Sequence, residues 1–273
     1  MDLSFLVVAA TLYFLATGGF VVHLLFSSDR LHRGGSFLLA SGFTVHTLAL
    51  LVRAFEAGYL PVTSFHEGLS LVGWLVVGAQ LLLERRSGLG VLGAFVAPLA
   101  FLFTFSSYVF YSGVEELPES LKNAWLPVHI APAFLGYAIL GVAFCLSLAY
   151  LLQENQLKAK RRSGLFRRLP SLERLDELNH RFVTWGFALF TLAIVTGAVL
   201  AKTAWGAFWS WEPVEVWSAV TWLLYAVLLQ MRSAGWRGRR AATLTIVGFA
   251  VLVVSFFGMN LVFPGRHGGR FGS

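Results

Sequence analysis

Eight long apolar segments dominate the sequence, and they restrict the chain to a bundle of membrane-spanning helices. A hydrocarbon core about 30 Å thick is crossed by roughly 20 apolar residues in a helix. Hydrophobic residues make up 57% of the chain and charged residues 13%, whereas soluble domains carry about 25% charged residues. We therefore predict an all-α, polytopic membrane protein whose residues 1–273 form one membrane domain. The eight segments are residues 3–26, 36–55, 69–83, 89–108, 127–152, 182–200, 214–231 and 241–263.

The basic residues gather in every second loop, which predicts how the bundle is oriented. The net charge is +7, and most Lys and Arg lie near residues 30–33, 85–86, 158–174 and 232–240. Cytoplasmic loops of membrane proteins carry an excess of Lys and Arg. We therefore expect these loops on the inner side of a bacterial-type cell membrane and both termini outside. Because the charge lies in short loops, it indicates membrane lipid headgroups as the anionic partner and no nucleic acid.

The single cysteine, Cys145, excludes one class of chemistry. It lies in an apolar run, and the chain has no second cysteine with which it could form a disulfide or a Cys-x-x-Cys pair. Thiol–disulfide exchange within this chain is therefore excluded. We interpret Cys145 as a small buried hydrophobic residue.

The longest basic segment, residues 153–180, contains a helix-start pattern. Ser171 is of a type that favours helix N-caps, and Leu172, Leu175 and Leu178 follow it on one helical face. We predict a short interfacial helix here that connects the fifth and sixth spans.

Five of the nine tryptophans fall within residues 205–222. One interpretation is an interfacial belt, because Trp is enriched at membrane surfaces. Part of the stretch is also helix-start chemistry, since Pro213 suits a first helical turn and Glu212 and Glu215 would interact well with the positive end of that helix. The alternative is an outward-facing aromatic platform, residues 201–217, for a flat and apolar ligand.

Two histidines far apart in the sequence are expected on the same side of the membrane as this segment. The tryptophan segment follows the sixth span, His129 begins the fifth span, and His267 lies beyond the eighth. All three face outside in the topology given above. Two neutral imidazoles beside an aromatic surface suit a metalloporphyrin, with one axial ligand on each side of the iron.

The other five histidines carry weaker indications. His23 and His46 lie inside apolar spans, where an ionisable residue is rare and often functional, and a packing role is the other interpretation. His66 lies in an outer loop and could contact a ligand or a partner. His32 and His180 lie on the cytoplasmic side, where loop and headgroup contacts account for them.

The stretch WGAFWSWEPVEVW, residues 205–217, resembles the tryptophan-rich signature of a known family. This is the CcsA family, also called ResC, of haem-handling cytochrome c assembly membrane proteins (System II). The matching motifs elsewhere are an outer loop at residues 61–70, a Trp-Leu-x-x-His segment at 125–129, a Gly-Ala-Val stretch at 197–199, a Phe-Gly-x-Asn segment at 257–260 and a glycine-linked histidine at 265–267.

The resemblance implies a haem-binding membrane protein that delivers haem at the outer face for covalent attachment to apocytochrome c. Haem b would bind non-covalently, with His129 and His267 as axial ligands of the iron. A CcsB- or ResB-like membrane protein would be its partner, and the apocytochrome would supply a Cys-x-x-Cys-His motif. The chain would be one subunit of a haem-attachment complex and not a stand-alone enzyme. The signature carries over to Trp205, Gly206, Trp209, Trp211, Glu212, Pro213, Glu215 and Trp217.

This chain departs from the family pattern at three places. Glu212 replaces the usual Asp, and Val214, Glu215 and Val216 stand where Lys-Glu-Thr is common. Many members have a histidine near the inner end of the seventh span, where this chain has Gln230. An amide is a poor iron ligand, so we expect one haem, at the outer face.

Two other functions fit parts of the same sequence. A haem-sensing or regulatory membrane protein of the same superfamily would have no cytochrome substrate and would act on a soluble cytoplasmic partner. A transporter would move haem or another amphipathic molecule across the bilayer, with His46 and His23 along its path. His23 could also face Gln230 at the inner side.

Overall fold

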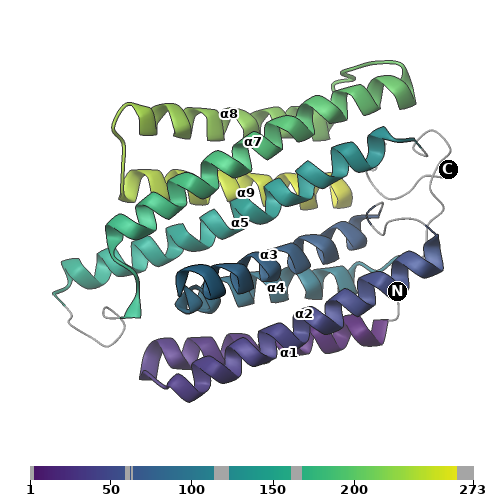
Figure 1. Ribbon diagram of the computed structural model, residues 1–273. Helices are drawn as coiled ribbons and strands as arrows, with labels where there is room; N and C mark the ends of the chain where they lie inside the picture. The colour runs from purple at the N-terminus through teal and green to yellow at the C-terminus, as the bar shows by residue number, and fades with distance from the viewer. Residues whose placement is uncertain (1–2, 59–61, 63, 114–122, 161–167, 263–273) are drawn as a thin grey trace.

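In the computed structural model, every element within the described residues is a helix (Figure 1). The described residues are 3–58, 62, 64–113, 123–160 and 168–262. Eight helices in these ranges are long and apolar enough to cross a membrane, which confirms the all-α class and the eight predicted spans. The helices are α1 (Leu3–Phe26), α2 (Asp29–Ala57), α3 (Phe65–Ser87), the 3₁₀ turn η1 (Gly90–Leu92), α4 (Gly93–Val109), α5 (Trp125–Lys158), α7 (Leu172–Trp205), α8 (Pro213–Ser233) and α9 (Arg239–Val262).

Polar caps set the ends of several helices. Ser64 and Glu67 form a capping box at the start of α3, where each side chain accepts a hydrogen bond from the other residue's backbone N–H. Ser171 caps α7 as predicted, with its hydroxyl accepting from Arg174 N at 3.3 Å. The helix that follows is not short, however, because α7 continues without a break to Trp205. No Pro or Gly separates the expected connector from the sixth span, so the two form one helix.

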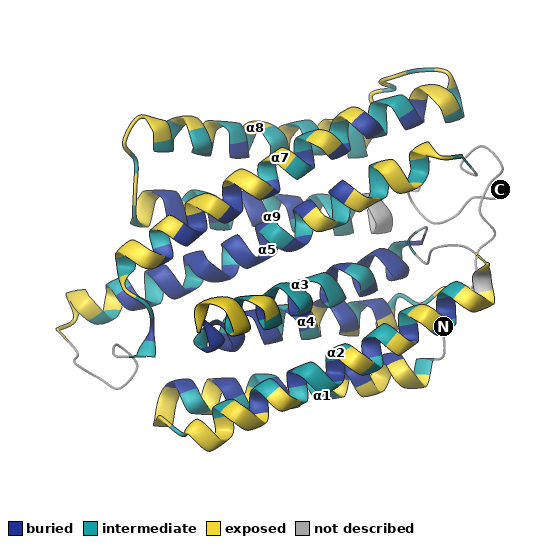
Figure 2. Ribbon diagram, viewed as in Figure 1, coloured by how far each residue is buried: buried dark blue, intermediate teal, exposed yellow. Residues whose placement is uncertain are grey.

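The helices pack as a row of pairs. The α1–α2 pair lies against α4, α3 packs on α4 and α5, and α5 lies against α7 and α9. The seventh span, α8, packs on α9 and α7 at the opposite side of the bundle from α1 (Figure 1). Buried residues make up 61% of the most apolar stretch of α5 but 17% of that of α8, so α5 is central and α8 peripheral (Figure 2).

The two ends of the bundle differ in chemistry. One end holds the α1–α2 and α8–α9 connections with Arg30 and Arg237, and we call it the basic end. The other end holds the α7–α8 connection, and we call it the tryptophan end. The described ends of the chain, Leu3 and Val262, both lie at the tryptophan end (Figure 1).

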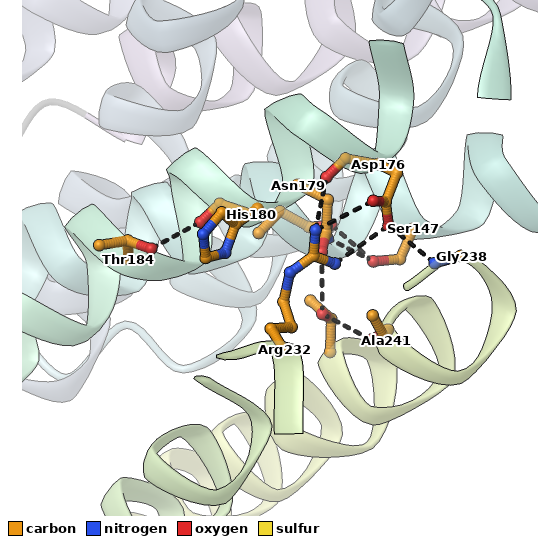
Figure 3. Close-up of polar contacts among 10 residues, drawn as sticks. Ser147, Asp176, Asn179, His180, Thr184, Arg232, Gly238 and Ala241 are labelled. Atoms are coloured by element: carbon orange, nitrogen blue, oxygen red, sulfur yellow. Dashed lines mark hydrogen bonds and ion pairs between the residues drawn. The ribbon is translucent and has the colours of Figure 1, made fainter. Parts of the chain in front are cut away.

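A group of polar contacts ties four helices together near the basic end (Figure 3). The Asp176 carboxylate of α7 accepts two 3.0 Å hydrogen bonds from the Arg232 guanidinium of α8 and one of 2.9 Å from Gly238 N. Asn179 donates to Ser147 Oγ of α5 at 2.8 Å and accepts from Thr245 Oγ1 of α9 at 3.4 Å. These bonds fix α7 against α5, α8 and α9 at the end opposite the tryptophan segment.

A buried ion pair joins α2 and α3 near the tryptophan end. A guanidinium nitrogen of Arg53 lies 2.5 Å from a carboxylate oxygen of Glu67, and both side chains are 1% exposed. Two buried charges are tolerated together because each compensates the other. The pair holds the N-terminal turn of α3 in place beside the cavity described next.

Candidate functional site

A cavity of about 270 Å³ opens among α3, α5, α7, α8 and α9 at the tryptophan end. This volume is near the lower end of the range of small-molecule sites, roughly 300–1,000 Å³, which are mostly apolar with a few polar groups. The wall here follows that description. It is formed mainly by the α5 residues Leu126, His129, Ile130, Ala133, Phe134 and Tyr137, the α7 residues Phe190, Ala193, Ile194, Gly197, Ala198 and Trp205, the loop residues Phe208 and Trp209, and Phe65, Gly68, Glu215, Ser218 and Phe256.

The cavity is deep as well as apolar. Its α5 wall extends from Leu126 to Tyr137, which corresponds to about 16 Å along a helix that rises 1.5 Å per residue. At the deep end, the Tyr137 ring lies 5.9 Å from the ring of Phe190 and 5.7 Å from that of Phe256. The depth of the cavity is thus about half the thickness of a hydrocarbon core, which is about 30 Å.

His129 is oriented by a backbone carbonyl of the neighbouring helix. Its Nδ1 lies 2.9 Å from the carbonyl oxygen of Ala193. A carbonyl oxygen only accepts, so Nδ1 carries the hydrogen and Nε2 carries the lone pair. Histidines that bind metals are commonly held in this way, with the second ring nitrogen donating to a carbonyl or carboxylate. The His129 side chain lines the cavity and is thus prepared as a ligand.

The tryptophan segment is divided between the cavity and the outer surface. Trp205, the last residue of α7, and Trp209 line the cavity. Trp211 is 77% exposed and its ring is perpendicular to that of Trp209, at 89° and 5.8 Å between centroids. Trp217 is exposed on α8. Two of its indoles, Trp205 and Trp209, therefore line the cavity, and the Trp209 side chain is also 38% exposed, whereas Trp211 and Trp217 are not part of the cavity wall.

Glu215 holds the tryptophan loop in shape. Glu212 is the N-cap of α8, Pro213 is its first residue, and Glu215 is at the third position, as the helix-start pattern predicted. The Glu215 carboxylate accepts hydrogen bonds from Ser210 N at 2.8 Å, Glu212 N at 3.2 Å and Ser210 Oγ at 3.3 Å. Gly206 ends α7 with a φ of 84°, a left-handed conformation that glycine adopts without strain.

Comparison with known proteins identifies the family of this chain. A family model described as "Cytochrome C assembly protein" matches residues 62–267. The chain belongs to this family. A cytochrome c biogenesis protein CcsA from Prochlorococcus marinus (strain MIT 9303) is 35% identical over 260 residues, covering 84% of this chain and 82% of that protein. A CcsA protein from Synechococcus sp. (strain CC9605) is 33% identical, with 84% of each chain covered.

A solved structure shares the fold of this cytochrome c assembly protein. The structure of a cytochrome c haem lyase, CcmF, superimposes with a TM-score of 0.64 at 19% sequence identity. The match covers 92% of this chain and 45% of that one, so this chain spans less than half the length of its structural neighbour. At this identity the likeness concerns the fold.

Haem, the group that the family resemblance implied, fits the residues of the cavity. The walls are aromatic and aliphatic, and they include one imidazole. Among the described residues, His129 is the one histidine that lines the cavity. The second expected ligand, His267, lies outside the described residues, so its role stays a prediction. Lys202, in the last turn of α7, donates to the Gly206 carbonyl at 2.8 Å and lies over the Phe208 ring.

The histidines within the spans have structural partners. His46 is fully buried, with Nδ1 3.3 Å from the Tyr13 hydroxyl and Nε2 2.8 Å from the Ser70 hydroxyl. His66 is buried beside the cavity wall, and its Nδ1 lies 3.0 Å from Ser64 Oγ. The contacts of His46 account for it as part of the helix packing, whereas the buried Nε2 of His66 has no hydrogen-bond partner among the described residues.

His23 and Gln230, which could have faced each other, lie far apart. Gln230 lies near the end of α8 and His23 near the end of α1, and these helices are on opposite sides of the bundle (Figure 1). The His23 Nδ1 donates instead to the carbonyl of Ser28 at 3.0 Å.

Several wall residues were missed by sequence reasoning. Phe134, Tyr137, Phe190 and Phe256 form the deep part of the cavity, but they stand in helices that are apolar on every face. Such helices show no periodic stripe that would separate a cavity face from a lipid face. For Gly197, the one indication in the sequence was its place in the Gly-Ala-Val motif.

Proposed function

We propose that this chain binds haem in the cavity at the tryptophan end and delivers it to an apocytochrome c. Membership of the cytochrome c assembly family gives the chain a role in the biogenesis of c-type cytochromes, as the sequence predicted. The observation that carries the finer proposal is His129, an imidazole that lines a deep apolar cavity and whose tautomer is set by the Ala193 carbonyl.

Each part of the site has a separate task in this proposal. His129 and His267 would hold the iron, and Trp205 and Trp209 would pack on the porphyrin by burial and stacking. Glu215 holds the loop that carries Trp209. Lys202, at the same loop, is suited to pair with a haem propionate. When bound, haem b supplies the iron and the vinyl groups that become thioether bonds in a c-type cytochrome.

The thiols for these bonds come from the substrate. Cys145 is buried within α5, where its Sγ lies 3.4 Å from the Phe95 carbonyl, and it is absent from the cavity wall. An apocytochrome with a Cys-x-x-Cys-His motif therefore supplies both cysteines and a replacement iron ligand. A CcsB- or ResB-like membrane protein completes the complex.

The tryptophan end faces the outside of the cell membrane in this proposal. The argument is the distribution of charge, because the basic end carries most of the described Lys and Arg and such loops stay in the cytoplasm. The transporter alternative has less support, since His46 is bonded to Tyr13 and Ser70 and His23 to the Ser28 carbonyl.

The test is the visible spectrum of protein purified from a haem-replete host. Wild-type protein should carry low-spin, six-coordinate haem, His129→Ala should lose most of it, and added imidazole should restore part of it. His180→Ala, an exposed histidine at the basic end, is the matched control and should keep its haem. Full haem retention in His129→Ala would remove this residue as a ligand. Haem binding without cytochrome c maturation in a complemented host would favour the regulatory alternative.

A further inference from the structure

The helices α5 and α7 approach each other closely at a glycine contact. A Cβ atom added at Gly136 of α5 would lie 3.3 Å from the backbone nitrogen of Phe190 and 3.4 Å from the carbonyl oxygen of Gly186. The two backbones are thus nearly in contact here. The two helices run in opposite directions along this contact (Figure 1).

Further toward the tryptophan end, His129 of α5 lies against α7. Two helical turns from Gly136, the α5 residue on the same face is His129. On α7, Ala193 lies two turns beyond Gly186 on the same face. Gly197 likewise lies two turns beyond Phe190. His129 Nδ1 donates to the Ala193 carbonyl at 2.9 Å.

Gly197 leaves room for the imidazole beside this carbonyl, which also accepts a hydrogen bond from the Thr196 hydroxyl at 3.2 Å. Side chains of a helix lean toward its N-terminus, so a side chain at position 197 would lie over the carbonyl of Ala193, one turn earlier. A Cβ at Gly197 would be 2.8 Å from His129 Cε1 and 2.9 Å from its Nδ1. Carbon atoms in proteins essentially never come so close without bonding, so the imidazole occupies the space that any other residue would fill.

We propose that Gly197 is a positioning residue for the haem ligand. It allows His129 to reach the Ala193 carbonyl, and that bond keeps the hydrogen on Nδ1 and the lone pair on Nε2. A carbonyl acceptor on Nδ1 also raises the basicity of Nε2. This inference rests on the proposed role of His129 as an iron ligand. It assigns Gly197 a task beyond helix packing.

Gly186 provides the matched control on the same helix. A Cβ there would come within 2.6 Å of Leu140 Cδ2 and 2.7 Å of its Cγ. Gly186→Ala therefore disturbs the same α5–α7 interface to a similar degree, but against an aliphatic side chain outside the cavity wall. An effect of general packing should appear in both variants, whereas an effect on the ligand should appear in Gly197→Ala alone.

The experiment measures haem affinity and spectrum in Gly197→Ala, Gly186→Ala and His129→Ala, in detergent and at matched protein recovery. Loss of an outer-shell partner of a metal ligand costs about ten- to 100-fold in affinity, so Gly197→Ala should bind haem that much more weakly. Imidazole should restore a six-coordinate spectrum in Gly197→Ala and His129→Ala. Gly186→Ala should match the wild type. Equal losses in both glycine variants, or no loss in Gly197→Ala, would overturn the proposal.

A haem-free measurement separates this inference from the proposed function. Diethyl pyrocarbonate modifies accessible imidazole nitrogens, and peptide mass spectrometry reports the rate at His129. The rate should rise in Gly197→Ala and stay at the wild-type value in Gly186→Ala, because only the first variant displaces the ring. A raised rate with haem binding unaffected in His129→Ala would refute the ligand role and the inference built on it. An unchanged rate in Gly197→Ala would refute the positioning role alone.

Discussion

Glu215→Gln distinguishes two effects of a carboxylate on haem binding. Glu215 lines the cavity, so its negative charge could repel haem propionates. Its oxygens also accept from Ser210 N and Glu212 N and thereby hold the loop with Trp209. The first effect predicts stronger haem binding in Glu215→Gln, and the second predicts weaker binding. We expect weaker binding, because the bonds are short and the haem propionates can remain near Lys202.

The size of the loss in haem affinity follows from the hydrogen bonds that the glutamine side chain of Glu215→Gln keeps. The glutamine oxygen can still accept both N–H groups, but each bond loses the roughly 1 kcal/mol that separates charged from neutral hydrogen bonds. The ordered loop is then destabilised by about 2 kcal/mol, which corresponds to at most about 30-fold in affinity. Glu215 also lies in the first turn of α8, so losing its charge weakens its interaction with the helix dipole.

Haem titration of the purified variant in lipid nanodiscs measures this change. Limited proteolysis of the tryptophan loop provides an independent measure of its order, and the loop should be cleaved faster in Glu215→Gln. An affinity equal to or above that of the wild type would refute the argument that Glu215 acts by holding the loop.

Two further predictions follow from burial. Trp209→Ala should lower haem affinity about ten-fold or more, because an indole of the cavity wall is lost. Trp211→Ala should change the affinity little, because the Trp211 ring is exposed. A haem titration that shows the reverse order would place the ligand on the outer surface. Glu67→Gln should lower the free energy of unfolding by about 3–5 kcal/mol, since it leaves the buried Arg53 charge without its carboxylate. Thermal unfolding in detergent measures the effect of Glu67→Gln, and an unchanged unfolding midpoint would contradict this prediction.

The helical spans and their ends were predictable because they depend on local chemistry. Long apolar runs identify the spans, and the predicted N-cap at Ser171 is present. Local chemistry did not reveal that the predicted short connecting helix and the sixth span form one continuous helix, α7. Helix propagation needs no signal, so only a breaker would have marked a boundary there.

The site was predictable only in part, because its geometry depends on contacts between distant segments. Topology placed His129 beside the tryptophan segment, and the cavity confirms that Trp205 and Trp209 lie with it. Topology did not show that Trp211 is 77% exposed, at a position where the backbone takes a positive φ of 60°. His46 was singled out because it is a polar residue within a span. Its hydrogen-bond partners, Tyr13 and Ser70, are far away in the sequence and could not be predicted from it.

The buried ion pair of α2 and α3 has a consequence for how the chain enters the bilayer during synthesis. Arg53 lies in the last turns of α2 and Glu67 in the first turn of α3, so few residues separate their arrival at the insertion machinery. A single charged residue raises the cost of inserting a helix, by up to about 3 kcal/mol at its centre. The two charges cancel this cost for one another once both helices are present. We therefore expect the α2–α3 hairpin, and not either helix alone, to be the unit that partitions into lipid.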